Sequence, residues 1–250
     1  MTQSAPGFTI VTLVPSLLDT NGDAQNAAVL ARRLHWAGHD ARVVAVEDGS
    51  GLPDEVDAVI VGSGNDSTLE PARERLLTMH DELRRWGTEG VPILSVGTGW
   101  ELLSWGVEFA DGRTVEGLGV LPGRAVPRSA GRATGDLVVR SPRFGHLVGF
   151  ENHAREYVQA EASPLGRIVA GVGNGRDAGQ EGVVMGWVLG THLHGPVLAK
   201  NPAMADAIAA EMASRAGVGY EPGERTAVVD GYAEEARRAQ LRAAGVALPA

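Results

Sequence analysis

A short stretch near the middle of the chain has the form of a nucleophile elbow, which is a sharp turn between a strand and a helix. Residues 91–104 contain an apolar segment, a glycine turn and the start of a helical pattern. Enzymes place a serine or cysteine at the apex of such a turn, near backbone N–H groups that stabilise an oxyanion. The apex here is Gly97, which has no side chain that could attack a substrate. The stretch alone is compatible with a site, with a former site or with an ordinary turn.

A histidine near the end of the chain could assist a nucleophile on that turn. His194 follows an apolar, strand-like segment and is followed by Gly and Pro. In this position it can serve as a general base. The alternative is a loop histidine with a purely structural role, because a single histidine carries little information. His192 is expected to point to the opposite face of the strand.

Three further groups of polar residues could contact a ligand. The loop at 62–66, Gly-Ser-Gly-Asn-Asp, can offer backbone N–H groups to an anion, but no Gly-Lys-Ser/Thr follows as in a Walker loop. The run at 151–153, Glu-Asn-His, is too compact for a standard metal site and is equally compatible with a hydrogen-bonded turn. Arg132 and Asp136 flank Gly135 at the start of a predicted strand. Each group also has an ordinary structural interpretation.

The composition excludes several classes of function. The 250 residues carry a formal net charge of −9, which argues against a general nucleic-acid or anionic-membrane binder. The chain has no cysteine, which rules out disulfides, thiolate metal sites and a cysteine nucleophile. No apolar run is long enough to span a bilayer, and residues 1–7 do not have the pattern of a signal peptide. We therefore expect a cytoplasmic protein with no membrane insertion, no metal and no cofactor.

The elements that must position these residues alternate along the first half of the chain. Strands are predicted at 8–14, 41–46, 57–61 and 91–96, with helices after the first, third and fourth; the third strand is followed by one long helix over 69–86. Thr20, Asn21 and Asp23 supply capping chemistry for the first helix. This order predicts an α/β fold with a mostly parallel sheet flanked by helices. Because ligands bind beyond the carboxyl ends of such strands, the loops at 15–23, 62–66 and 97–101 should converge.

The second half of the chain has a different pattern. Short strands are predicted at 117–126, 131–140, 146–150, 167–172 and 182–189, and a helix at 202–215 begins with a favoured proline. Residues 224–244 are rich in Ala and Arg and predict an appended helix. We expect one domain over 8–215 and a C-terminal helical extension over 216–250.

Several of these motifs, in the same order, resemble the class I glutamine amidotransferases of the CobB/CobQ type. The motifs are the run from Leu13 to Asp23, the run at 149–153 and the run at 190–196 with 200–202. They are most similar to the GatD-type branch, the glutaminase subunits of lipid II isoglutaminyl synthase. The resemblance covers roughly residues 8–215 and implies the fold of that family.

The resemblance also implies a mechanism and a set of site residues. In the family, a cysteine on the elbow attacks the side-chain amide of glutamine, a histidine assists, and ammonia passes to a Mur-ligase-like, ATP-dependent partner. His194 matches the position of the histidine, and the loop with Gly64 matches the oxyanion loop. The resemblance implies substrate contacts for Gly64, Asn65, Thr98, Glu101, Arg132 and Asn152.

The chain departs from the family pattern at the centre of the site. The pattern Cys-Gly-Gly-Tyr-Gln-Leu-Leu aligns with residues 97–103, so that Gly97 takes the position of the nucleophile and Glu101 that of a glutamine-contacting Gln. Glu101 can only accept hydrogen bonds when ionised, which would favour a ligand with an amine or a cation. Thr98, Ser95 and Ser104 are weak substitutes for the missing thiol.

Three hypotheses follow for the function. The first is a degenerate glutaminase that acts with a Mur-ligase-like amidoligase and binds a small amine or an amino acid. The second is a scaffold module that is retained for assembly alone. The third is an enzyme with a repurposed amide or amine site that uses His194 and Glu101.

Overall fold

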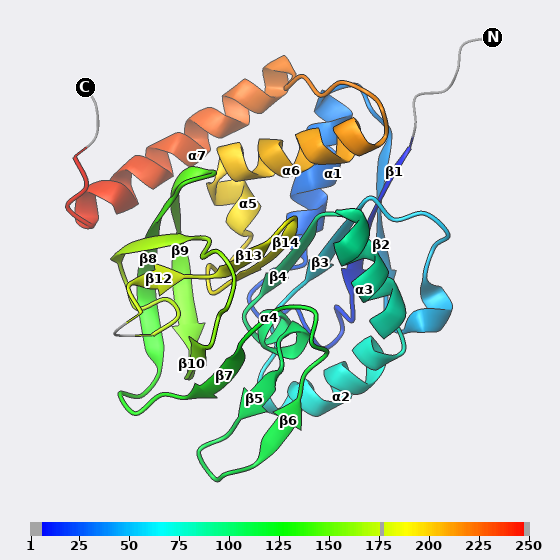
Figure 1. Ribbon diagram of the computed structural model, residues 1–250. Helices are drawn as coiled ribbons and strands as arrows, with labels where there is room; N and C mark the ends of the chain where they lie inside the picture. The colour runs from blue at the N-terminus through cyan, green and yellow to red at the C-terminus, as the bar shows by residue number, and fades with distance from the viewer. Residues whose placement is uncertain (1–6, 176–177, 248–250) are drawn as a thin grey trace.

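A six-stranded sheet forms the centre of the molecule in the computed structural model, which describes residues 7–175 and 178–247 (Figure 1). The strand order is β13-β14-β4-β3-β1-β2. All neighbours from β14 to β2 are parallel, and only the edge strand β13 is antiparallel. The predicted α/β fold with a mostly parallel sheet is therefore confirmed. The strands are β1 Phe8–Leu13, β2 Ala41–Val46, β3 Ala58–Val61, β4 Ile93–Val96, β13 Val183–Met185 and β14 Val188–Thr191.

Helices cover both faces of this sheet, and alternate residues of each central strand face the two layers (Figure 1). In β1, Phe8 and Ile10 pack into a core with α1, α5 and α6, whereas Val11 and Leu13 pack into a core with α2, α3 and α4. This alternation explains why the strands are short and apolar throughout. The helices are α1 Gln25–Trp36, α2 Asp66–Leu77, α3 His80–Glu89, α4 Thr98–Leu103, α5 Val197–Lys200, α6 Pro202–Arg215 and α7 Glu224–Ala243, with a short 3-10 helix, η1, at Gly49–Gly51.

Two smaller, four-stranded sheets accompany the central sheet. One has the order β10-β7-β5-β6 and the other β12-β11-β8-β9. The first shares a core with α2, α3 and α4, and the second packs against α5 and α7. The strands are β5 Gly106–Glu108, β6 Thr114–Glu116, β7 Arg124–Pro127, β8 Ala133–Ser141, β9 Gly145–His153, β10 Arg155–Val158, β11 Gly166–Ala170 and β12 Gln180–Glu181.

The predicted helix over 69–86 is wrong, because the structure divides this segment into α2 and α3. Thr78 ends α2, and its hydroxyl donates to the Arg75 carbonyl at 2.6 Å and accepts the Gly49 N–H at 2.8 Å. Met79 then leaves the helical conformation, with φ −120° and ψ 14°, and its side chain is fully buried. Local bonding by a threonine hydroxyl thus competes with the helix at this point.

Three further predictions about the second half need correction. Residues 117–123 are not a strand, since β6 ends at Glu116 and β7 begins at Arg124. Residues 151–153 are not a turn but the end of β9, which pairs with β8. The segment at 182–189 is a hairpin of β13 and β14 rather than one strand.

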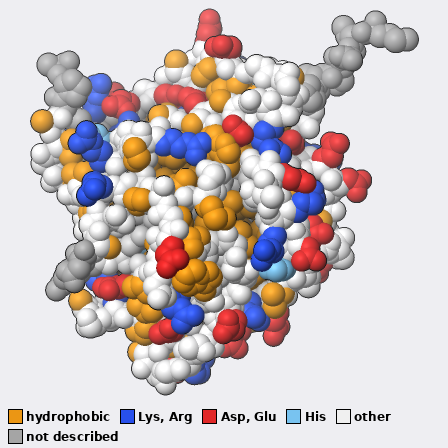
Figure 2. Space-filling model, in the orientation of Figure 1, with side chains coloured by type: hydrophobic (Ala, Val, Ile, Leu, Met, Phe, Trp, Pro, Cys, Tyr) orange, Lys and Arg blue, Asp and Glu red, His pale blue; other side chains and the backbone are white. Residues whose placement is uncertain are grey.

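None of the helices within the described ranges is long and apolar enough to cross a membrane. Residues 1–6, on which the expectation of no signal peptide largely depends, lie outside the described residues. Acidic and basic side chains are interspersed over the face of the molecule in Figure 2.

Candidate functional site

Gly97 forms the apex of the turn between β4 and α4. Its backbone has φ 52° and ψ −120°, a conformation that glycine adopts without the strain other residues meet. The Gly97 N–H donates to the Thr191 carbonyl at 2.9 Å and so fixes the turn against the end of β14. A Cβ placed on Gly97 would lie 2.6 Å from His194 Cε1 and 3.0 Å from Ser63 Cβ. The imidazole therefore occupies space that any side chain at position 97 would need.

His194 is buried beside this turn and contacts two side chains from the loop before α1. Its Nδ1 lies 3.4 Å from Asp23 Oδ2 and 3.1 Å from Asn21 Nδ2. The carboxylate requires a proton on Nδ1, whereas the amide nitrogen requires a lone pair there. If Nδ1 donates to Asp23, Nε2 of the neutral ring has a lone pair and can act as a base. If Nδ1 instead accepts from Asn21, Nε2 carries the proton. Nε2 lies 3.3 Å from the Cβ position of Gly97 and has no hydrogen-bond partner within the described residues.

Asp23 is fully buried and is held by several donors. It accepts hydrogen bonds from the Ser63 hydroxyl, from the Ser63 N–H at 3.2 Å and from the Gly195 N–H at 3.1 Å. Burial alone would raise the pKa of Asp23, but the contact with His194 and these hydrogen bonds outweigh it and hold the pKa below its usual value. Asp23 is therefore an ionised partner for His194 at neutral pH.

The expected capping role of the loop before α1 is wrong. The N-cap of α1 is Ala24, which makes no side-chain capping hydrogen bond. Asn21 donates to the Ser63 hydroxyl at 2.9 Å, and the Thr20 N–H donates to the Ser63 carbonyl at 2.9 Å. These polar residues build the site instead, and sequence reasoning missed both Asp23 and Asn21 as partners of His194.

The loop at 62–66 approaches the elbow closely. A Cβ on Gly64 would lie 2.3 Å from Thr68 Oγ1 and 2.6 Å from the Leu17 carbonyl oxygen, so only glycine fits there. The Thr98 hydroxyl donates to the Gly64 carbonyl at 3.1 Å. Asn65 forms a capping box with Thr68 at the start of α2, and its Oδ1 accepts the Ser67 N–H at 2.9 Å.

Glu101 does not present a free carboxylate to a ligand. Arg155 donates to both of its oxygens, from Nε at 2.9 Å and from Nη2 at 2.8 Å, and also contacts Asp66 at 2.8 Å. Burial would lower the pKa of Arg155, but the two carboxylates outweigh it and raise the pKa above its usual value. The expectation that Glu101 selects a cation is therefore wrong, because the protein supplies the cation. The feature of the sequence that could have indicated this ion pair is Arg155, which lies two residues after the 151–153 motif.

Arg132, just before β8, and Asn152, on the neighbouring β9, lie at the rim of the site. Arg132 Nη1 donates to Asn152 Oδ1 at 3.0 Å and to the Asn152 carbonyl at 3.3 Å. Asp136 is not part of the site, since its carboxylate accepts a hydrogen bond from Gln240 Nε2 on α7 at 2.9 Å.

The predicted site residues converge on one cavity of about 550 Å³. The three loops expected to meet at the carboxyl edge of the sheet all reach it. Ser63 and His153, which belong to the two polar runs at 62–66 and 151–153, also line this cavity, and so does Arg155, which was not predicted. Those that were predicted are Gly64, Asn65, Gly97, Thr98, Glu101, Arg132, Asn152 and His194, and all eight line the cavity.

This arrangement agrees with a family match over most of the chain. Residues 20–202 match the family described as the CobB/CobQ-like glutamine amidotransferase domain. The chain belongs to this family.

Individual relatives agree with this assignment. The chain is 32% identical over 219 residues to the lipid II isoglutaminyl synthase (glutamine-hydrolyzing) subunit GatD of Staphylococcus aureus, covering 87% of this chain and 89% of the relative. It is 28% identical to the subunit of the same name from Streptococcus pneumoniae, covering 78% and 76%. A glutamine amidotransferase structure from Thermotoga maritima superposes with a TM-score of 0.52 at 12% identity, covering 93% of each chain. The class I amidotransferase-like fold and the GatD-like resemblance are thus confirmed.

This CobB/CobQ-like domain lacks the usual nucleophile of its family, since the chain has no cysteine. The three hydroxyls considered as substitutes for the thiol each donate to a backbone carbonyl. Ser95 donates to the Leu189 carbonyl at 2.9 Å, Ser104 to the Glu101 carbonyl at 2.6 Å, and Thr98 to the Gly64 carbonyl as described above. Because each of these hydroxyls donates to a carbonyl, none of them replaces a thiolate activated by His194.

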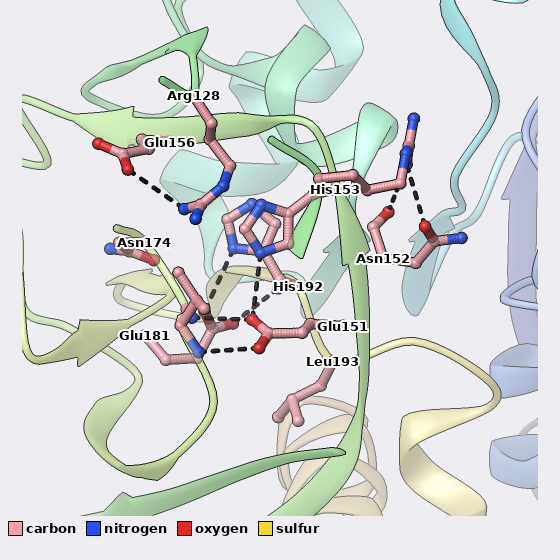
Figure 3. A network of polar contacts seen from close by, with 12 residues as sticks. Arg128, Glu151, Asn152, His153, Glu156, Asn174, Glu181, His192 and Leu193 are labelled. Carbon is pink, nitrogen blue, oxygen red and sulfur yellow. Dashed lines mark hydrogen bonds and ion pairs between the residues drawn. The ribbon is translucent and has the colours of Figure 1, made fainter. Parts of the chain in front are cut away.

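A second polar network adjoins the cavity at His153, which also lines the cavity (Figure 3). His192 Nδ1 lies 3.2 Å from Glu181 Oε2, and its ring stacks on that of His153 with the centroids 3.9 Å apart. His153 faces two acceptors, the Arg155 carbonyl at 2.7 Å and Glu151 Oε2 at 3.2 Å. Within residues 7–175 and 178–247, no cluster of three or more His, Asp or Glu side chains is arranged to hold a metal ion.

Burial and charge set the protonation of this network. Burial, and then the neighbouring His153, lower the pKa of His192 despite Glu181. Burial would raise the pKa of Glu181 and of Glu151, but His192 and His153 and the donated hydrogen bonds hold both pKa values below the usual value. A neutral His192 is therefore packed between the ionised Glu181 carboxylate and the His153 ring.

Proposed function

We propose that this chain is the amidotransferase-like subunit of an amidoligase pair and that it does not hydrolyse glutamine by the covalent route. The observation that carries the proposal is Gly97 at the apex of the elbow, with the His194 ring in the space of a side chain. Hydrolysis through a thioester requires a thiolate, and the chain contains no cysteine.

The proposed partner is a Mur-ligase-like, ATP-dependent subunit that uses free ammonia or another amine. Two relatives are described as subunits of lipid II isoglutaminyl synthase, which supports a role in an assembly. In this proposal the chain keeps the fold and the cavity but leaves the supply of the amine to the solution or to another protein.

The experiment measures glutamate release from glutamine by the chain alone and with a co-purified ligase. We expect none above background, and ligase activity that depends on an ammonium salt whether or not glutamine is present. Robust glutamine hydrolysis by the unmodified chain would overturn the proposal. Gly97→Cys serves as a matched variant: we expect it to stay inactive, because His194 must move to admit the new side chain.

A second candidate is an enzyme with a repurposed amide site. It is favoured by His194 Nε2, which is buried beside Gly97 and has no hydrogen-bond partner in the described part of the chain. With Nδ1 donating to Asp23, this nitrogen could take a proton from a water molecule that attacks an amide carbon.

A thermal-shift series with glutamine, glutamate and small amines separates the two candidate functions above from a scaffold module that binds no ligand. A ligand that binds only the folded chain raises Tm. No shift with any compound would favour the scaffold, whereas a shift that disappears in His194→Ala would favour a ligand seated beside Gly97.

A further inference from the structure

Two side chains compete for Nδ1 of His194, and they would select opposite tautomers of the ring. Asn21 Nδ2 lies 3.1 Å from Nδ1, within the usual hydrogen-bond range, whereas Asp23 Oδ2 lies at 3.4 Å, beyond it. An amide nitrogen can only donate, so a bond from Asn21 uses the Nδ1 lone pair and leaves the proton of the neutral ring on Nε2. The tautomer therefore depends on which end of the Asn21 amide faces the ring.

The Ser63 hydroxyl determines the orientation of that amide. Asp23, whose pKa is held below its usual value, is ionised and can only accept, so the single hydroxyl proton of Ser63 goes to Asp23 Oδ2. The Ser63 oxygen is then an acceptor toward the Asn21 amide, 2.9 Å away. Only the Nδ2 end can donate to it, because the Oδ1 end would bring two acceptors into contact. The same Nδ2 has a second hydrogen, and it lies within bonding distance of His194 Nδ1.

Asp23 already has other donors and does not need one from the imidazole. Its Oδ2 accepts both the hydroxyl and the N–H of Ser63, the latter at 3.2 Å, and its Oδ1 accepts the Gly195 N–H at 3.1 Å. A carboxylate oxygen has two lone pairs, so both positions on Oδ2 are occupied. Asp23 therefore contributes its charge near His194 rather than a well-formed hydrogen bond.

Backbone contacts on both sides of Asn21 hold its amide in place. The Thr20 N–H donates to the Ser63 carbonyl at 2.9 Å, and the Gly22 N–H donates to the Asp19 carbonyl at 3.1 Å. Gly22 has φ 73°, in the left-handed region that glycine adopts without strain. Rotation of the Asn21 side chain away from the imidazole would also break its bond to the Ser63 hydroxyl. The amide is thus not free to adjust to the ring.

We propose that Asn21 is a positioning residue that holds the proton of His194 on Nε2, so that this histidine presents a donor beside Gly97 instead of a base. A nitrogen that carries a proton has no lone pair with which to take one from water. The tautomer therefore favours the subunit that does not hydrolyse amides over the repurposed enzyme. This consequence for the chemistry rests on the proposed function, whereas the tautomer itself does not.

The test reads the tautomer directly from long-range proton–nitrogen NMR spectra of the full-length chain labelled with ¹⁵N. Such spectra distinguish protonated from unprotonated ring nitrogens, and the signals of His194 are those that disappear in His194→Gln. At about pH 8, above the reference histidine pKa of about 6.5, we expect Nε2 to be protonated and Nδ1 to be unprotonated. A protonated Nδ1 in the parent chain, with or without a proton on Nε2, would overturn the proposal.

Two variants of Asn21 supply the decisive comparison, because a free histidine also prefers the proton on Nε2. Asn21→Leu removes the donor, and Asn21→Asp keeps the size of the side chain but offers only acceptors. In both we expect the ratio of the tautomers to shift toward Nδ1 by about tenfold or more, as for the loss of one hydrogen bond. An unchanged tautomer in both variants would overturn the proposal.

Asn152→Ala is the matched control, since Asn152 also lines the cavity but bonds to Arg132 instead of His194. We expect it to keep the tautomer of the parent chain, and a shift equal to that of the Asn21 variants would refute a specific role of Asn21. Far-UV circular dichroism and Tm verify that each variant is folded. Failure of the proposed function would be seen as glutamine hydrolysis by the parent chain, and failure of the positioning role as an unchanged tautomer, so the two are distinguishable.

Discussion

Two buried histidines, two residues apart in the sequence, lie in different environments. His192 contacts Glu181 at 3.2 Å and stacks on His153 with the ring centroids 3.9 Å apart. His194 contacts Asp23 at 3.4 Å, while its Nε2 faces Gly97 without a hydrogen-bond partner in the described residues. Both have a carboxylate at Nδ1, so the carboxylate alone does not distinguish them. The difference lies in what surrounds the rest of the ring.

This difference separates a histidine enclosed by protein groups from one that lines a cavity. The His192 ring does not line the cavity, and its contacts join β12, β14 and the end of β9. The His194 cluster is equally buried but ends at a cavity. The predictions below test whether stability depends on the first cluster and depends little on the second.

We expect the largest effect from Glu181→Ala. Glu181 is fully buried and accepts hydrogen bonds from the Thr191 hydroxyl at 2.7 Å and the His192 N–H at 2.6 Å, besides its contact with the His192 ring. Its removal leaves these donors unpaired, which should cost about 3–5 kcal/mol of unfolding free energy. Urea unfolding measures the loss, and the exposed Glu55→Ala serves as the control. A loss no greater than that of the control would mean that this network does not stabilise the fold.

The ion pair in the cavity wall should give the next largest effect. Arg155→Met leaves the buried Glu101 carboxylate without its cation, at a cost of about 3 kcal/mol. Adding Glu101→Gln removes that charge, so we expect the double variant to be more stable than Arg155→Met alone. Unfolding free energies of the two single variants and the double variant test this coupling. If the change in unfolding free energy of the double variant equals the sum of the changes in the two single variants, the two side chains act independently.

The buried titratable groups predict a loss of stability in acid. The pKa of His192 is lowered in the folded state, so below about pH 6.5 the unfolded chain binds a proton that the folded chain does not. The depressed pKa values of Asp23, Glu151 and Glu181 act in the same direction at lower pH, since their stabilisation is lost as pH falls through the folded values.

Tm should therefore fall as the pH is lowered from 7 toward 4. In His192→Gln, the part of this fall that begins near pH 6.5 should be reduced, whereas the exposed His35→Gln should keep it. Equal pH profiles for His192→Gln and the parent chain would refute a neutral, buried His192.

The smallest effect is expected for His194→Ala, within about 1 kcal/mol of the parent chain. The substitution removes a buried nitrogen that has no partner among the described residues, and Asp23 keeps its hydrogen bonds from Ser63 and Gly195. His192→Ala should cost clearly more, because it also removes a ring that packs on His153 and Trp100 away from the cavity, and so leaves an internal void. Similar losses for the two variants would remove the distinction between the two clusters.

Local patterns predicted much of the fold. The strand at 41–46 and the helix at 202–215 agree with β2 and α6 to the residue, because apolar periodicity and the proline in the first turn are local properties. The break at 78–79 was not predictable in this way, since it depends on a threonine hydroxyl that also bonds to Gly49. The eight proposed site residues were found through the resemblance of separated motifs. The geometry of a parallel sheet predicted that the loops at 62–66 and 97–101 meet, but it did not place Arg132 or Asn152, which lie at a second, antiparallel sheet.

The sequence by itself determined the chemistry that this protein lacks. Without a cysteine, and with Gly97 at the apex, no thioester can form at the elbow, whatever the fold. Only the tertiary structure decided how the remaining groups are paired. It joined Asp23 to His194 and Arg155 to Glu101, and it placed the His194 ring in the space above Gly97. The physical reason is that the type of a side chain is a local property. Its charge state and its free hydrogen-bonding capacity depend instead on burial and on distances to residues far away in the chain.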